Sequence, residues 1–399
     1  MSKRKIVSLP GDGIGQVVLD QAIRVITAAG FDAEYIHGDI GWEYWCKEGN
    51  PLPQRTIDLI AEHKIALFGA ITSKPKDEAA AELDSSLRDK GFIYSSPIVG
   101  LRQHFNLDIC IRPCRSYIGN PLNFIRRGRD GSIEEPGVDV VIFRQNTEGL
   151  YGGVEWSNPP KQVYDAFMTH PKFQKNFGKV PVNELAISTR IFSKNATERI
   201  VRAAFEYARK YGYRSVTVCE KPNVIRETSG MMLLLAKQIK KNEFPEIELW
   251  NTNIDAQMMW LTKNPEDYGV IVAGNMFGDI ASDAFAGLIG GLGFACSAQM
   301  SDDGIAVFDP THGSAPKYAD FEVSIVNPIA MIESACMMLD YFEENEISSK
   351  IRKAIADVIE EGIVRTYDMM KMRGSTEALR NGAASTSMLT DAIIEKLQQ

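Results

Sequence analysis

The sequence predicts an α/β fold, and two features of its 399 residues carry this prediction. First, short apolar runs have the length and composition of buried strands, as in Ile65–Ala70 and Ser215–Cys219. Second, amphipathic segments of helical length alternate with such runs. Strands that alternate with helices are typical of α/β domains. With 44% hydrophobic residues, the chain can bury a sizeable core and is long enough for two domains.

The chain opens with a predicted strand, glycine turn and helix. Lys5–Leu9 is the strand, Pro10–Gly15 is the turn, and Val17–Ala29 is the helix, which Gly30 ends. The turn has the spacing G-x-G-x-G, whereas dinucleotide-binding turns have G-x-G-x-x-G. A tight connection between strand and helix is therefore a better interpretation than a phosphate-binding loop.

Two segments are predicted to lie outside the regular core. Residues 75–92 are charged, which favours a surface excursion, and residues 156–185 combine prolines and aromatic residues in an irregular pattern. Just before the first of them, Ile71–Lys74 is a polar loop at the carboxyl end of a strand. Ligand sites of α/β proteins lie at such ends.

An amphipathic helix is predicted from Asn195 to Gly212. Asn195 and Glu198 have the spacing of a capping box, and Gly212 is a stop signal. The apolar stripe of this helix is formed by Ile200, Val201, Ala204, Phe205 and Ala208. The next strand, Ser215–Cys219, places Lys221 beyond its carboxyl end.

Composition excludes several classes of protein. The net charge of −8 argues against a nucleic-acid partner. The six cysteines are scattered without a C-x-x-C pair, so we expect reduced thiols and a cytoplasmic location. The first residues run directly into a strand, so we expect no signal peptide. The longest weakly polar run, Ala284–Ala298, is too short for a bilayer, so we expect no membrane association.

Asp279 and Asp283 form a candidate metal site. They follow the predicted buried strand Gly269–Gly274, and a helix that begins near Gly278 would place both carboxylates on one face. Two adjacent carboxylates repel each other unless a cation lies between them, and hard oxygen ligands suit Mg²⁺ or Mn²⁺. The alternative is one capping aspartate and one solvated aspartate.

Arg102, Arg112 and Arg144 form a candidate anion site. Each lies at or beyond an apolar run, where a guanidinium group is costly unless an anion meets it. Three surface salt bridges would explain the same pattern equally well.

From Arg144 to Tyr151 (RQNTEGLY) the sequence resembles the β-decarboxylating hydroxyacid dehydrogenases, which act on isocitrate, 3-isopropylmalate, homoisocitrate or tartrate-type substrates. The resemblance extends over nearly the whole chain. The matching stretches are Pro10–Gly15, Leu101–Pro113, Phe143–Trp156, Glu220–Arg226, Ile254–Ala256, Asn275–Gly291, Thr311–Ala319 and Asn327–Pro328.

The resemblance implies a substrate site. Arg102, Arg112 and Arg144 match the positions that bind the carboxylates of the malate core. Ser96 matches a position that touches the variable group of the substrate.

The resemblance also implies a metal site and an acid–base pair. Asp279 and Asp283 match metal ligands, and Asp255 matches a third ligand that comes from the partner subunit of a homodimer. Tyr151 and Lys221 match the acid–base pair, and Lys221 also crosses from the partner. In the chemistry that the resemblance implies, a divalent cation would lower the pKa of the substrate hydroxyl, and Lys221 would accept its proton while hydride leaves to a nicotinamide. The β-keto acid would then lose CO₂, and Tyr151 would return a proton to carbon.

In this family the coenzyme does not use the Rossmann glycine fingerprint. The positions that hold adenine are matched by His312, Gly313 and Asn327, and Thr72 matches the loop on the nicotinamide side.

The choice of coenzyme is predicted from four residues. Lys317 and Tyr318 resemble the NADP type, because a lysine supplies charge for a 2′-phosphate. Tyr367 and Lys371, four apart in a predicted helix, match further phosphate contacts, with lysine where arginine is usual. We therefore predict NADP as the coenzyme.

The substrate prediction rests on a departure from the family pattern. NADP-type isocitrate enzymes carry Ser-x-Asn-x-x-Leu-Arg, and this chain has Ile98 in place of the asparagine. That change is closer to homoisocitrate and some isopropylmalate enzymes, whereas Tyr151–Trp156 resembles the isocitrate form. We rank isocitrate first, homoisocitrate second and isopropylmalate third. A non-catalytic regulatory subunit ranks lowest, because the implied acid–base and metal residues are all retained.

The resemblance finally implies an architecture. A large, coenzyme-binding domain is formed by residues 1–107 and 290–399, and a small domain by residues 108–148 and 195–289. Residues 149–194 form a clasp that ties two subunits together. The fold is that of isocitrate and isopropylmalate dehydrogenases, with a cleft between the domains.

Overall fold

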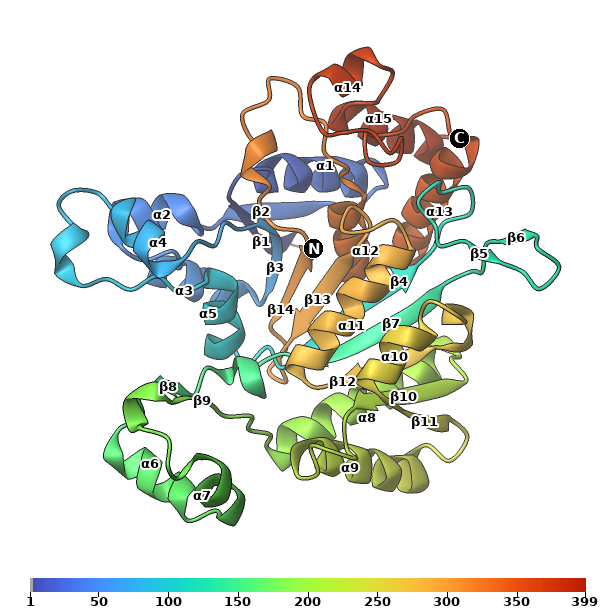
Figure 1. The fold of residues 1–399 in the computed structure, drawn as a ribbon. Helices are drawn as coiled ribbons and strands as arrows, with labels where there is room; N and C mark the ends of the chain where they lie inside the picture. Colours follow the sequence, from blue (N-terminus) through green and yellow to red (C-terminus); the bar gives the residue numbers. More distant parts are fainter. Residues whose placement is uncertain (1–2) are drawn as a thin grey trace.

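The α/β prediction is confirmed by the computed structural model of the protein, which describes residues 3–399. One ten-stranded sheet runs through the molecule (Figure 1). In sheet order its strands are β11 (Glu248–Asn253), β10 (Ser215–Glu220), β12 (Val270–Ala273), β7 (Asp139–Gln145), β4 (Ile109–Arg115), β13 (Cys296–Met300), β14 (Ala306–Pro310), β3 (Ile65–Ala70), β1 (Arg4–Gly11) and β2 (Ala33–His37). Neighbours are parallel except around β4 and β13, where β7, β4, β13 and β14 pair in antiparallel fashion.

The sheet is covered by helices at both of its halves. Four of them pack together near β1, β3 and β14: α1 (Gly15–Ala28), α12 (Ile329–Tyr341), α13 (Asn345–Glu361) and α15 (Thr386–Leu397). Around β7, β10, β11 and β12 lie α8 (Lys194–Tyr211), α9 (Thr228–Glu243), α10 (Ile254–Trp260) and α11 (Asn275–Leu288). Helix α12 is buried from Ile329 to Leu339, as expected for a helix that is apolar on all sides and lies inside the core.

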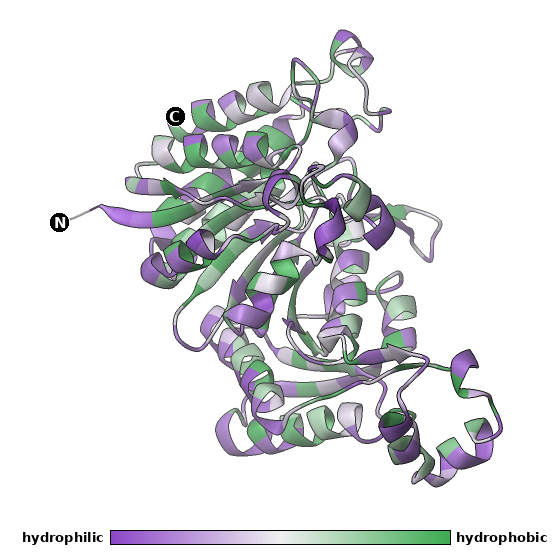
Figure 2. Ribbon diagram, turned by 90° about the vertical axis from the view of Figure 1, so that its left-hand side faces the viewer, coloured by the Kyte–Doolittle hydropathy of each residue, from purple (hydrophilic) through white to green (hydrophobic). Residues whose placement is uncertain are grey.

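The core follows from strands that are buried on both faces. Every residue of β3 and of β10 is buried, so these strands read as continuous apolar runs instead of alternating patterns. Figure 2 shows the hydrophobic strands between helices whose outer faces are hydrophilic. Among residues 3–399, no helix combines the length and the apolar character needed to cross a membrane.

Several predicted elements are confirmed closely. Strand β3 has the predicted bounds, the five stripe residues of α8 are buried, and Gly212 ends α8 in the left-handed conformation. The predicted capping box is wrong: the N-cap is Ser193, whose Oγ accepts a hydrogen bond from the Ala196 amide at 3.3 Å. Helix α11 begins at Asn275, almost one turn before the predicted start near Gly278.

Residues 156–185 contain more structure than predicted. They form an arm that extends from the rest of the molecule, shown in green in Figure 1, with helices α6 (Lys161–Met168) and α7 (Pro171–Phe177). Phe173 packs against Tyr164, Phe167 and Phe177, so the aromatic residues form a partly exposed cluster that joins the two helices. The short strands β8 (Glu155–Ser157) and β9 (Ala186–Ser188) pair at the base of the arm.

The remaining elements surround the sheet. They are α2 (Trp42–Glu48), α3 (Gln54–His63), α4 (Lys76–Ala81), α5 (Pro97–His104), α14 (Glu377–Arg380), the hairpin strands β5 (Arg126–Arg127) and β6 (Ile133–Glu134), and the 3₁₀ turns η1 (Arg88–Lys90), η2 (Leu150–Gly152), η3 (Val182–Glu184), η4 (Pro265–Asp267) and η5 (Pro316–Tyr318). The predicted surface excursion at residues 75–92 contains α4 and η1, and packs on a satellite core around Trp45.

Candidate active site

Arg112 and Arg144 face helix α11 from two adjacent strands. In the antiparallel pairing of β4 with β7, Cys110 lies opposite Arg144, so Arg112 is the diagonal neighbour of Arg144 on the same face. Helix α11 packs on both strands. A Cβ atom on Gly278 would lie 2.8 Å from Cβ of Arg144, so glycine permits this close approach.

The two carboxylates of α11 converge on these arginines. Nη1 of Arg112 lies 3.2 Å from Oδ1 of Asp279 and 3.4 Å from Oδ1 of Asp283, and it donates to Oγ of Ser282 at 2.7 Å. Arg144 forms an ion pair with Asp279 and donates from Nε and Nη2 to Oδ1 of Asn275 at 3.0 and 2.9 Å. Because one nitrogen contacts both carboxylates, Asp279 and Asp283 border the same space.

Burial decides the electrostatics of this cluster. The Arg144 side chain is 3% exposed, whereas that of Asp283 is 60% exposed. Burial, and then the neighbouring guanidinium groups of Arg112 and Arg102, lower the pKa of Arg144 to about 10. Burial also raises the pKa of Asp283, against the opposing effect of Arg112. A positively charged, partly desolvated site of this kind favours an anionic ligand.

Arg102 enters the site from α5, and two buried residues that sequence reasoning missed hold it there. Its Nε donates to Oε1 of Gln299 at 2.7 Å, and Nε2 of Gln299 donates to both oxygens of Asp309 at 2.9 Å. Gln299 and Asp309 lie on the core strands β13 and β14. The sequence feature that could have identified Gln299 and Asp309 is a polar side chain inside a strand that is otherwise buried. Ser96 lies at the start of α5, half-buried.

The predicted acid–base residues lie in two places. Tyr151, in η2, is 45% exposed, and its ring centre is 5.9 Å from Cζ of Arg144. Lys221 lies beyond the end of β10 and forms an ion pair with Asp255 at the start of α10. One chain therefore brings Tyr151 to the arginine cluster and keeps Lys221 with Asp255 as a separate pair.

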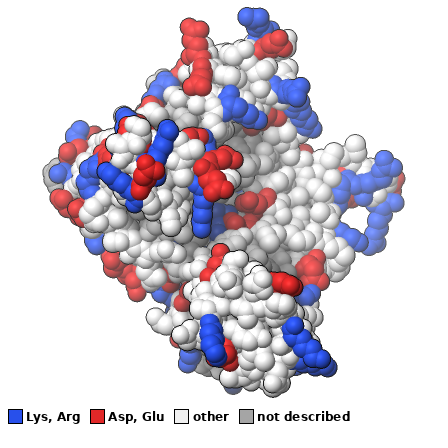
Figure 3. Space-filling view, turned by 60° about the vertical axis from the view of Figure 1, so that its left-hand side comes forward, with Lys and Arg blue, Asp and Glu red and all other residues white. Residues whose placement is uncertain are grey.

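The chemistry of Asp279 and Asp283 suits a divalent cation, because carboxylate oxygens are hard ligands that here face one space. Across residues 3–399, no three histidine, cysteine, aspartate or glutamate side chains gather closely enough to hold a metal ion. Figure 3 shows a hollow in the surface with acidic and basic side chains around it.

Among the predicted coenzyme residues, Thr72 follows β3, and His312 and Gly313 follow β14. Oγ1 of Thr72 lies 2.6 Å from Oγ of Ser314, which joins the Thr72 loop to the loop after β14. Nε2 of His312 is buried without a hydrogen-bond partner among residues 3–399, and burial lowers the pKa of this histidine. A neutral imidazole with an unpaired nitrogen fits a base of a dinucleotide. Gly313, next to it, is exposed.

Lys317, Tyr318 and Tyr367 form a cluster at the same loop. Nζ of Lys317 lies 4.6 Å from the ring centre of Tyr318, and this ring lies 5.6 Å from that of Tyr367. Asn327 donates to Oδ2 of Asp368 at 3.1 Å. The helix predicted for Tyr367 and Lys371 is wrong: this segment is a turn, and Lys371 has the left-handed φ of 55°.

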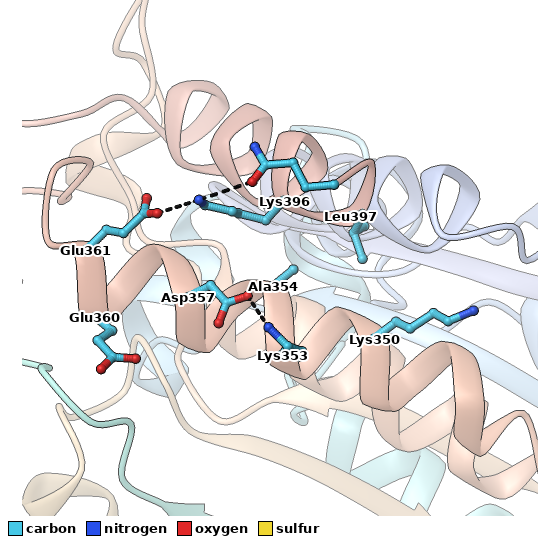
Figure 4. A pocket seen from close by; sticks show the side chains of 9 residues that line it. Lys350, Lys353, Ala354, Asp357, Glu360, Glu361, Lys396 and Leu397 are labelled. Carbon is cyan, nitrogen blue, oxygen red and sulfur yellow. Dashed lines mark hydrogen bonds and ion pairs between the residues drawn. The ribbon is translucent and has the colours of Figure 1, made fainter.

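A separate groove lies between α13 and α15 (Figure 4). Lys353 pairs with Asp357 at 2.6 Å, Lys350 pairs with Glu346 at 2.9 Å, and Lys396 pairs with Glu361. Because the charges of this groove neutralise each other, the arginine–aspartate cluster is the better candidate for an anion site.

The chain is similar to known proteins over nearly its whole length. The family model described as isocitrate/isopropylmalate dehydrogenase matches residues 5–393. Protein DlpA of Legionella pneumophila is 37% identical over 98% of this chain, which spans 58% of the length of that protein. Homoisocitrate dehydrogenase of Methanocaldococcus jannaschii is 38% identical over 88% of this chain and 89% of its own length. The crystal structure of isocitrate dehydrogenase from Methylococcus capsulatus matches with a TM-score of 0.79 at 33% identity, covering 99% of this chain and 100% of that one.

The family model therefore covers both ends of the sheet, the arginine–aspartate cluster and the loops of Thr72 and His312. On this basis the chain belongs to the isocitrate/isopropylmalate dehydrogenase family, a family of β-decarboxylating oxidoreductases that act on small hydroxy acids with NAD or NADP and a divalent metal.

Proposed function

We propose that this protein oxidatively decarboxylates isocitrate to 2-oxoglutarate and reduces NADP. The observation that carries the proposal is the convergence of Arg112 and Arg144 with Asp279 and Asp283 beside Tyr151. Guanidinium groups bind carboxylates through paired hydrogen bonds, so this cluster suits a substrate with several carboxylates.

The residues have distinct tasks in this proposal. Arg102, Arg112 and Arg144 bind the carboxylates of the substrate and hold its hydroxyl-bearing carbon in place. Lys221 of the partner subunit takes the hydroxyl proton, and Tyr151 returns a proton to carbon after CO₂ leaves. A divalent cation held by Asp279, Asp283 and Asp255 of the partner subunit would supply Lewis-acid stabilisation of negative charge on oxygen. NADP would accept the hydride.

Homoisocitrate is the second candidate substrate, because of Ile98. This side chain stands where NADP-type isocitrate enzymes have an asparagine, a change closer to the homoisocitrate pattern, and it packs against the apolar cluster of Leu101 and Phe105. Isopropylmalate is third, since the half-buried Ser96 and the neighbouring arginines favour a charged or polar group there.

The preference for NADP rests on charge at the coenzyme loop. Lys317 is exposed beside Tyr318, where its ammonium group can meet a 2′-phosphate, and Lys371 follows the turn that carries Tyr367. His312, Gly313, Asn327 and Thr72 would hold the remainder of the dinucleotide.

The decisive experiment is an activity assay of the purified chain with isocitrate, homoisocitrate and 3-isopropylmalate, each with NADP and with NAD. We expect the largest kcat/KM for isocitrate with NADP, and loss of activity after removal of divalent metal by a chelator. A larger kcat/KM with homoisocitrate than with isocitrate would make homoisocitrate the proposed substrate. Metal-dependent turnover by this chain alone would exclude a non-catalytic regulatory subunit.

The proposal includes a homodimer of two-domain subunits in the cytoplasm. The large domain would comprise residues 1–107 and 290–399, the small domain residues 108–148 and 195–289, and the clasp residues 149–194. The arm with α6 and α7 lies within the clasp range and extends from the sheet (Figure 1).

A further inference from the structure

The glycine turn Pro10–Gly15 has no role in the proposed chemistry, yet its hydrogen bonds form a distinct pattern. The amide of Asp12 donates to the carbonyl of Ala70 at 2.7 Å, that of Ile14 to the carbonyl of Ser314 at 3.0 Å, and that of Gly15 to the carbonyl of Asp12 at 2.9 Å. These three amides are engaged within the protein, whereas a phosphate-binding loop directs its amides at the ligand. The turn therefore joins other loops.

The carboxylate of Asp12 connects two of those loops. Its Oδ1 accepts a hydrogen bond from the amide of Trp42 at 2.6 Å, and its Oδ2 accepts one from the amide of Thr72 at 2.8 Å. Trp42 begins α2, and Thr72 follows β3. Because β1 and β3 are adjacent and parallel, their carboxyl ends meet at one edge of the sheet, and a single side chain reaches both loops.

The backbone around this carboxylate fits closely. Gly41 has a φ of +114°, and a Cβ atom there would lie 2.4 Å from Oδ1 of Asp12. A Cβ atom on Gly13 would lie 2.2 Å from the carbonyl oxygen of Ser314. Both glycines thus allow separate segments to approach the turn more closely than any other residue would.

The same connections lead to the coenzyme loop. Thr72 contacts Ser314 through their hydroxyl groups at 2.6 Å, and the amide of Ser314 donates to the carbonyl of Ile71 at 3.2 Å. Ser314 lies two residues after His312. Tyr94 donates to the carbonyl of Thr72 at 2.7 Å and holds this loop from its other side.

We infer that Asp12 is a positioning residue for the coenzyme site: its carboxylate fixes the Thr72 loop against α2 and, through Ser314, aligns it with the loop of His312. The inference rests on the proposed function in one respect, namely that these two loops bind a nicotinamide dinucleotide. It does not depend on which hydroxy acid is the substrate or on whether NAD or NADP is used.

The test is Asp12→Asn, in which one carboxylate oxygen becomes an amide NH₂ that faces a backbone N–H. We expect the Kd of NADPH, measured by fluorescence titration without substrate, to rise about tenfold, because hydrogen bonds to charged acceptors are among the stronger ones. The KM of the coenzyme should rise equally, whereas kcat and the KM of the hydroxy acid should change less than twofold. Amide hydrogen exchange at Trp42 and Thr72 should become faster in the free protein.

The matched control is Asp58→Asn on α3, an exposed aspartate that accepts a side-chain hydrogen bond from Gln54 at 2.9 Å. It should leave the coenzyme Kd, both KM values, kcat and the amide exchange rates unchanged. If Asp12→Asn fails to fold, Ser314→Ala replaces it, because this change removes only the hydroxyl contact with Thr72 and should raise the coenzyme Kd by a smaller factor.

An unchanged coenzyme Kd in a folded Asp12→Asn variant would overturn the inference, as would a uniform loss of kcat and stability with normal exchange at Trp42 and Thr72. If the wild-type protein bound neither coenzyme, the proposed function would fail. If only the inference were wrong, the wild-type protein would bind the coenzyme and Asp12→Asn would bind it equally well.

Discussion

At the scale of single residues, Lys221 and Tyr151 are expected to serve different steps. Lys221→Met should abolish oxidation, with a fall in kcat of at least about 10²-fold, because it removes the group that accepts the hydroxyl proton. Tyr151→Phe should mainly slow the steps after hydride transfer, since only the return of a proton to carbon needs its hydroxyl. Supplying the β-keto acid directly and following its conversion separates these steps. Lys47→Met, an exposed lysine paired with Glu43, is the control. Near-normal turnover in both site variants would contradict the assignment.

Asp108 gives a prediction for the pH dependence of stability. This carboxyl group is 2% exposed and pairs with Arg199, and burial raises its pKa to about 6 despite that partner. The ordinary value in an unfolded chain is about 3.9. Between these values the folded protein retains a proton that the unfolded chain has lost, so the contribution of Asp108 to stability is present below about pH 4 and declines by up to about 3 kcal/mol as pH rises to 6.

Asp108→Asn should remove this dependence. Urea unfolding at a series of pH values should show the wild-type free energy of unfolding falling relative to that of the variant between pH 4 and 6, and a constant difference above pH 6. A difference that stays constant over the whole range would show that Asp108 is ionised throughout.

The arginines and aspartates of the site could be predicted from the sequence, whereas the residues that hold them could not. Arg112 and Asp279 are unusual in type for their positions beside apolar runs, which makes them visible. Gln299 meets Arg102, and Asp309 holds Gln299, because β13 pairs with β4 and β14 pairs with β13, although β13 and β14 lie far along the chain from α5. Such a pairing depends on sheet order, which one sequence does not display.

At the scale of secondary structure, variants of α8 can show which residue stabilises the start of this helix. Ser193→Ala should lower the free energy of unfolding by about 1 kcal/mol, because the Oγ of this N-cap residue satisfies an amide of the first turn. Asn195→Ala should be nearly neutral, since Asn195 is exposed within the helix and alanine has the higher helix propensity. Thermal unfolding of both variants measures the contrast. A larger loss of unfolding free energy for Asn195→Ala would instead support the capping box that the sequence pattern suggested.

Other misjudged elements have a common cause. The spacing of Tyr367 and Lys371 suits a helix, but the left-handed Lys371 and the hydrogen bond from the Met372 amide to the Tyr367 carbonyl close a single turn. Helix α11 begins at Asn275, because its side chain accepts from Arg144 and the buried carboxylate of Glu220 accepts from the Gly274 amide. In each case hydrogen bonds that periodicity does not reveal decided the boundary, a local one in the turn and tertiary ones at the start of α11, whereas local periodicity located the buried strands and the face of α8 correctly.

At the scale of the whole molecule, the sheet order explains how distant parts of the sequence meet. Strands β4 and β13 are antiparallel neighbours in the middle of the sheet, so the half that carries α11 and the half that carries the loops of Thr72 and His312 share one continuous sheet. Arg199 of α8 pairs with Asp108 and, at 2.9 Å, with Asp302 beyond β13, and thus links the two halves again. This geometry connects the arginine–aspartate cluster and the loops of Thr72 and His312 through one sheet.

The proposed dimer predicts complementation between two inactive variants. Lys221→Met and Asp279→Asn damage groups that, in the proposal, come to each site from different chains. Mixed dimers formed by co-expression would contain one intact site, so random pairing should restore about a quarter of wild-type activity.

The control uses two residues that should come from the same chain. Lys221 and Asp255 pair with each other within a chain, so they should enter a neighbouring site together. The matched control is therefore Lys221→Met with Asp255→Asn, a mixture in which every site has one damaged group and no activity should return. Equal activity in the two mixtures, or none in the first, would show that each chain carries a complete site.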